Sequence, residues 1–225
     1  MKRNQSGFTL IEIAIVLVII GLLLGGVLKG QELINSAKVK NLATDFRNIP
    51  VYVYGYQDKF RALPGDDNQA ISHVSAATNG DGSGLIDGPW DSLKAANETQ
   101  KFWADVRLAG LAAGPTTGPD LLPTNAVGGV IGITSSNTAN FSDPSAGTPT
   151  NPKISGSYII CSSGILGKYA KQLDLQMDDG SPIGGSMREF TDTTPGTRPS
   201  TLIVPTALTN GMINDNDTFT VCMGV

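Results

Sequence analysis

One carboxylate stands inside the longest apolar stretch of the chain. Glu12 is the only ionisable side chain between Phe8 and Leu28. As a helix this stretch is about 30 Å long, which matches the hydrocarbon core of a bilayer. A carboxylate in lipid costs up to about 2.5–3.5 kcal/mol on insertion scales, and less near the end of a span. Glu12 therefore predicts a functional site at which a cation meets the carboxylate.

Gly7 and Phe8 form a junction within the hexapeptide GFTLIE, which ends at Glu12 and follows a short leader that carries Lys2 and Arg3. This hexapeptide resembles the processing signal of type IV prepilins and type II secretion pseudopilins. The resemblance implies that a membrane prepilin peptidase cuts after Gly7 and N-methylates Phe8. It also implies that Glu12 is the assembly glutamate of the family. The new α-ammonium of one subunit would neutralise the Glu12 carboxylate of another, so that Glu12 fixes the register of the filament.

Two other kinds of N-terminal segment fit the sequence less well. A cleaved secretory signal has an apolar core of about 7–15 residues with the cut after it, whereas here the cut precedes a longer core. An uncleaved signal anchor would tolerate an apolar stretch of this length, but it does not explain why Gly7 and Phe8 precede Glu12 at this spacing. The basic leader predicts a cytoplasmic start, with residues 30–225 on the other side of the inner membrane.

The composition bounds the rest of the chain. The net charge is −4, and cleavage would remove Lys2 and Arg3 and make the chain more acidic. Such a charge argues against general nucleic-acid binding, which requires clustered Lys and Arg. With 27 Gly and 13 Pro, the region after the apolar stretch is expected to be rich in loops.

Two cysteines lie in the half predicted to be exported. Cys161 and Cys222 are the only cysteines of the chain. The exported compartment permits disulfides, so the two are expected to pair and tie down the C-terminal region. The chain-entropy model gives a bridge over a loop of about sixty residues roughly 4 kcal/mol.

One loop is similar to the first part of an EF-hand calcium loop. In the segment Asn79–Asp87, oxygen-bearing side chains stand at alternate positions and are followed by glycine. The four proposed ligands are Asn79, Asp81, Ser83 and Asp87. The loop departs from the pattern in beginning with Asn and in placing Trp90 where the bidentate Glu belongs. The residues that could complete the set are Asp66, Asp67 and Asp91. Calcium is thus the candidate cofactor, and a turn whose polar side chains bond the local backbone is the alternative.

The sequence predicts no enzyme. It contains no G-x-S-x-G, H-E-x-x-H, P-loop or G-x-G-x-x-G motif. The pair Asp178–Asp179 could serve a carboxylate-based hydrolase, but an Asp-Asp-Gly turn explains it better. His73, the only histidine, is expected to be an exposed loop residue rather than a ligand.

A long helix has to position the N-terminal site. From Val39 to Leu63 apolar residues recur at alternating steps of 3 and 4, so the apolar stretch should continue into an amphipathic helix that ends near Ala62. Pro50 should bend it. The further predicted elements are a helix from Asp91 to about Leu111, a short helix around Gly164–Leu173, and strands at Val130–Ile133, Ser157–Cys161, Ser186–Phe190, Leu202–Val204 and Thr218–Met223.

These elements predict an α+β, pilin-like fold. A long N-terminal helix packs on an antiparallel β-sheet, with an additional helix and a loop-rich head. The predicted divisions are a cleaved leader (1–7), a transmembrane and assembly half of the helix (8–28), an amphipathic half (29–63) and a globular head (64–225).

The expected function is that of a structural subunit of a type IV pilus-like filament. Its partners would be identical or related pilin subunits, the prepilin peptidase and the pilus or type II secretion machinery. It would reside in the inner membrane as a precursor, and in an extracellular pilus or a periplasmic pseudopilus after assembly. Many filament pilins carry a proline where this chain has Lys29, so a pseudopilin or a minor tip pilin is the alternative. A membrane-tethered, calcium-dependent binding protein is the alternative from another class.

Overall fold

The computed structural model describes residues 9–92, 96–118, 121–136, 154–191, 206–207 and 212–225. The chain forms two compact units, of which the first ends at Lys38 and the second comprises Val39–Val225. The first helix, α1 (Leu10–Phe60), contributes to both units.

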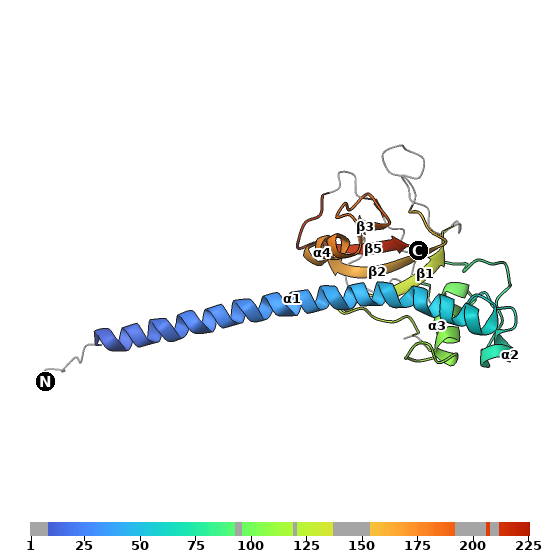
Figure 1. The fold of residues 1–225 in the computed structure, drawn as a ribbon, viewed down its shortest axis with the longest axis horizontal. Helices are drawn as coiled ribbons and strands as arrows, with labels where there is room; N and C mark the ends of the chain where they lie inside the picture. The colour runs from blue at the N-terminus through green and yellow to red at the C-terminus, as the bar shows by residue number, and fades with distance from the viewer. Residues whose placement is uncertain (1–8, 93–95, 119–120, 137–153, 192–205, 208–211) are drawn as a thin grey trace, which may run out of the picture. The chain divides into compact units, whose positions relative to one another are not determined.

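Within the second unit, α1 buries one face. The buried residues of the helix are Val39, Leu42, Ala43, Phe46, Ile49, Val53 and Tyr56. Most of them share a core with strand residues such as Ile133, Ile160 and Val221. This part of α1 lies along one face of the sheet (Figure 1). The amphipathic helix predicted from the apolar spacing is therefore confirmed, and so is its packing on the sheet.

The helix continues through Pro50 and ends at Phe60. Proline removes one hydrogen bond from the helical ladder, but burial of Phe46, Ile49 and Val53 on either side holds the segment on the sheet. Arg61 then adopts a left-handed conformation with φ 58°, which stops the helix two residues before the predicted end near Ala62.

The sheet has five strands in the order β1-β2-β5-β3-β4, and all neighbours are antiparallel. The strands are β1 (Ile131–Ser135), β2 (Tyr158–Leu166), β3 (Met187–Thr191), β4 (Thr206–Ala207) and β5 (Thr218–Gly224). The predicted α+β class, with a long N-terminal helix and an antiparallel sheet, is confirmed. The strand predicted at Leu202–Val204 lies outside the described residues.

Alternate residues of the strands face two different cores. Ile160 and Val221 face α1, whereas Ile159 and Phe190 face a smaller core that contains Trp90. Successive side chains of a strand point to opposite faces of the sheet, so apolar residues at successive positions indicate a sheet that is covered on both faces. The backbone of Trp90 passes so close to Gly132 that a Cβ at this position would collide with it.

Three shorter helices complete the second unit. They are α2 (Ala70–Val74), α3 (Glu98–Leu108) and α4 (Gly167–Met177). The helix predicted to begin at Asp91 starts instead at Glu98. Its first amides, those of Glu98 and Thr99, donate to the backbone oxygen of Asp87 at 3.0 and 3.4 Å. The helix therefore begins where the preceding loop presents an acceptor, a tertiary contact that local sequence does not reveal.

Candidate functional site

The N-terminal site begins with a capped helix. The predicted processing residues Gly7 and Phe8 lie outside the described residues, and α1 starts directly after Thr9. The amide and the hydroxyl of Thr9 donate to Glu12 Oε2 at 2.8 and 2.7 Å. The amide of Glu12 lies 3.4 Å from Thr9 Oγ1. This is the reciprocal capping box, whose T-x-x-E pattern is present in the sequence although the prediction of the site did not use it.

The capping box fixes where the Glu12 carboxylate lies. It is exposed and turned back toward the start of α1, where the first amides of a helix carry partial positive charge. A cation formed near Thr9 would therefore meet the carboxylate at the end of the helix. The role of Glu12 in assembly stays a prediction.

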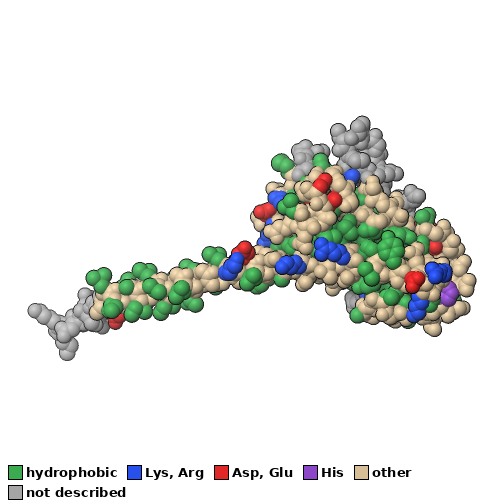
Figure 2. Space-filling view, viewed as in Figure 1, with side chains coloured by type: hydrophobic (Ala, Val, Ile, Leu, Met, Phe, Trp, Pro, Cys, Tyr) green, Lys and Arg blue, Asp and Glu red, His purple; other side chains and the backbone are tan. Residues whose placement is uncertain are grey.

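The apolar stretch of α1 is exposed along its length. Among its side chains Leu10 is 92% exposed and Leu22 is 73% exposed. Figure 2 shows hydrophobic side chains along this part of the helix, between an acidic side chain at its start and the basic and acidic side chains that follow it. Within the part of the chain that the structure describes, α1 is the one helix long and apolar enough to cross a membrane. The first charged pair after the stretch joins Lys29 to Glu32 at 2.6 Å.

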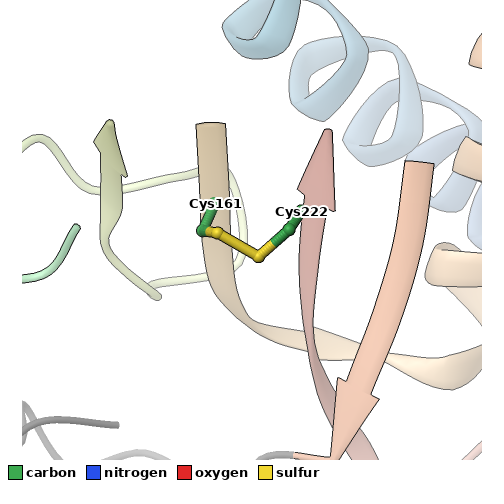
Figure 3. Close-up of a disulfide and its surroundings, with 2 residues drawn as sticks. All are labelled: Cys161 and Cys222. Atoms are coloured by element: carbon green, nitrogen blue, oxygen red, sulfur yellow. A yellow bond between two sulfur atoms is a disulfide. The ribbon is translucent and has the colours of Figure 1, made fainter. Parts of the chain in front are cut away.

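A disulfide joins the two cysteines. Cys161 on β2 and Cys222 on β5 are direct partners in the antiparallel register, with Cα atoms 4.1 Å apart. Figure 3 shows the bond crossing between these two strands. Both cysteines are fully buried. The bond therefore ties β5, the central strand of the sheet, to its neighbour β2.

The calcium-like loop is held in a different way from the one its sequence suggests. The side chain of Asn79 accepts a hydrogen bond from the Ile71 amide at 2.9 Å, and the amide of Asp87 donates to Glu98. Among the four proposed ligands, Asp81 belongs to a cluster of carboxylates that could hold a metal ion. The other two members of this cluster are Asp66 and Glu98. The calcium ligand set Asn79, Asp81, Ser83 and Asp87 stays a prediction.

Asp66 and Glu98 are the residues around which the loop is built. Asp66 accepts hydrogen bonds from the amides of Ser83 and Gly84, each at 2.8 Å. Glu98 accepts from the amides of Asp81 and Asp87, each at 3.0 Å. Burial raises the pKa of Asp66 and of Glu98, while hydrogen bonds with Ser83 lower the pKa of Asp81. An acidic group exists here that could bind a metal, although the same carboxylates already satisfy loop amides.

His73 does not lie in an exposed loop as predicted. It belongs to α2, its side chain is 26% exposed, and its Nδ1 lies 2.7 Å from Oδ2 of the buried Asp67. The hydroxyl of Tyr56 donates to the same oxygen at 2.8 Å. Burial raises the pKa of Asp67, but hydrogen bonds with His73, Gln69 and Tyr56 outweigh this effect. The pKa of Asp67 therefore lies below its ordinary value. Tyr56, Asp67 and His73 thus connect the end of α1 to α2, which gives the histidine a structural contact.

Replacing Tyr56 with Phe is expected to lower the free energy of unfolding of the detergent-solubilised chain by about 1.5–3 kcal/mol, the range for a hydrogen bond to a charged group. Urea unfolding followed by circular dichroism measures the loss. Tyr54→Phe is the matched control, because Tyr54 is 62% exposed and its change should stay within about 0.5 kcal/mol. Equal stability of the two variants would contradict the role given to Asp67.

Residues 2–28 match a family model described as the prokaryotic N-terminal methylation motif. This is the prepilin signature of type IV pilins and pseudopilins, and the match confirms the resemblance drawn from GFTLIE. It covers the leader, the junction and the apolar stretch. A search of curated proteins and a search of solved structures each found no match.

Proposed function

We propose that the chain is a structural subunit of a type IV pilus-like filament, cut after Gly7 by a prepilin peptidase, N-methylated at Phe8 and assembled through α1. The single observation that carries this proposal is the coincidence of the methylation motif at residues 2–28 with the capped start of an exposed apolar helix. The role is mechanical rather than enzymatic.

Assembly would bury the apolar surface of α1. In the precursor, the stretch Leu10–Leu28 is solvated by lipid tails. In a filament, the helices of neighbouring subunits replace those tails, and packing between helices takes over from lipid contact. The second unit needs no change during this step, because its core is closed over the residues from Val39 onward.

Charge pairing would select the register. Cleavage after Gly7 creates an α-ammonium at Phe8. This group is next in the chain to Thr9, whose amide already donates a hydrogen bond to Glu12. When one subunit docks beside another, this ammonium can neutralise the carboxylate of its neighbour. A subunit out of register leaves both charges unpaired in an apolar bundle, which costs far more than a shift among apolar contacts.

A pseudopilin of a type II secretion machine, or a minor tip pilin, is the second candidate. The observation that favours it is Lys29, where many filament pilins have a proline; here α1 is continuous through this position and Lys29 pairs with Glu32. Calcium in the loop Asn79–Asp87 stays a prediction under either candidate.

Fractionation of the producing cells separates the candidates. Filaments sheared from the cell surface should contain the processed chain in quantity if it is a pilus subunit, and immunoblotting measures the ratio to the membrane fraction. Processed chain that stays wholly with the cells would favour the pseudopilus. A chain that is never cut, in either fraction, would overturn both.

A further inference from the structure

Four acidic residues converge between α4, the loop that follows it and β3. Asp174 lies on the buried face of α4, one turn after Ala170. Asp178 and Asp179 follow the end of the helix, and Glu189 lies on β3. One carboxylate oxygen from each of Asp174, Asp178 and Asp179 lies within 4.8 Å of the other two. Glu189 shares the α4-facing side of β3 with Met187, since the two are separated by one strand period.

Two of these carboxylates are buried without a hydrogen-bond donor. Asp174 and Glu189 are each 1% exposed. Neither oxygen of either residue accepts a hydrogen bond of normal geometry from the residues that the structure describes, although the Gly180 amide lies near Asp174 and the Glu189 amide lies near its own carboxylate. Burial of an unpaired carboxylate is among the most costly arrangements in a protein interior, and such groups are paired or coordinate metals. These two side chains therefore indicate a ligand that the protein chain itself does not supply.

The other two carboxylates are held in fixed positions. Asp178 accepts hydrogen bonds from the Ser186 hydroxyl at 3.0 Å and from the Met187 amide at 2.8 Å. Asp179 accepts from the Ser181 amide at 2.8 Å. Gly185, with φ 63°, passes so close to the Asp178 carboxylate that a Cβ there would collide with it. Such outer hydrogen bonds orient carboxylates that ligate a metal.

The ion pairs among the described residues leave all four acids out. On α4, Lys171 pairs with Asp215 and Lys168 lies over the Tyr169 ring. Burial and the charge of Asp174, with Asp178 and Asp179 contributing less, raise the pKa of Glu189 to about 8. Burial and the charges of Asp179 and Asp178 likewise raise the pKa of Asp174 to about 6.

We propose that Asp174, Asp178, Asp179 and Glu189 form a calcium site that fastens the end of α4 to β3. The donor set is made of oxygen alone, which suits a hard cation rather than zinc or copper. Four carboxylates provide up to eight oxygens, and calcium takes six to eight. The ion would neutralise the two buried charges and close the loop between Asp178 and Met187. This site is separate from the loop Asn79–Asp87 and goes beyond the function proposed above.

Calcium chloride alone is the probe for this site. The full chain in detergent is stripped of metal with a chelator, dialysed, and unfolded thermally at increasing calcium concentrations. The unfolding midpoint should rise with the logarithm of the calcium concentration once this exceeds the dissociation constant. Half-saturation is expected at about 10⁻⁴–10⁻³ M or below, the range of extracellular modules, and magnesium should act more weakly. A midpoint that calcium does not move would overturn the proposal.

Two variants locate the ion. Asp174→Asn should raise the calcium concentration required for the same shift at least tenfold, while its calcium-free midpoint equals or exceeds that of the wild type because a repulsive charge is gone. Glu189→Gln should act in the same way and serves as the second variant if Asp174→Asn does not fold. Asp58→Asn is the matched control, because the Asp58 side chain is 86% exposed and lies outside both acidic groups, and this variant should keep the response. An unchanged response in Asp174→Asn and Glu189→Gln would contradict the proposal, as would its loss in Asp58→Asn.

Discussion

Glu12→Ala is expected to prevent filament assembly while leaving the second unit folded. The variant keeps the apolar surface of α1 but removes the carboxylate that would neutralise the ammonium of a neighbour. An unpaired charge in an apolar environment costs about 2.5–3.5 kcal/mol on insertion scales, and less near the end of a span. Each 1.4 kcal/mol is a factor of ten in an equilibrium constant, so the loss per docking step is on the order of tenfold or more. The yield of sheared filaments measures the effect.

Two further variants separate charge from helix capping. Glu12→Gln keeps an acceptor for the Thr9 amide but removes the charge, so it should also fail to assemble if pairing is the cause. Glu32→Ala removes an exposed carboxylate from the same helix, one that pairs with Lys29, and should assemble normally. Normal filaments from Glu12→Ala would contradict the assembly role of this residue.

Removing the disulfide is expected to cost about 4 kcal/mol of unfolding free energy. The double variant Cys161→Ser, Cys222→Ser releases a cross-link over a sequence separation of 61 residues, and in the chain-entropy model this raises the entropy of the unfolded state. The released segment includes α4, β3 and β4. Because both positions are buried in the sheet, unpaired serines add a further cost.

Urea unfolding of the detergent-solubilised chain measures this loss, with the oxidised wild type as the reference. Wild type treated with a reductant is the matched control, since it breaks the bond without changing a residue and should lose a similar amount. A loss below about 1 kcal/mol in both would show that the sheet holds β5 in place without the bond.

The parts of the fold that sequence predicts are those with a local period. Val39, Leu42, Phe46 and Ile49 recur at helical spacing, and this pattern alone determines which face of α1 is buried. Strand β5 and the first part of β2, up to Cys161, are short apolar runs that the sequence predicts, whereas β2 extends to Leu166, where the start of a short helix is predicted instead. The start of α3 is not predicted, because it depends on the backbone oxygen of Asp87, which only the folded loop brings to Glu98.

The candidate sites divide in the same way. The N-terminal site is contiguous from Gly7 to Glu12, so spacing alone reveals it. The acidic groups join residues far apart in the chain, such as Asp66 with Glu98, or Asp174 with Glu189, and their partners are set by tertiary packing. Asp174 did carry one local signal, since it occupies the apolar face of α4 next to Leu173, where a carboxylate is out of place.

The intact mass of the chain in purified filaments or membranes tests the central claim most directly. A mass that corresponds to a chain beginning at Phe8 with one added methyl group, and with Cys161 and Cys222 oxidised, is the predicted result. It would show that the peptidase cuts after Gly7 and that the new terminus is a methylated Phe8. A mass that corresponds to a chain still beginning at Met1, in cells with an active prepilin peptidase, would contradict the account.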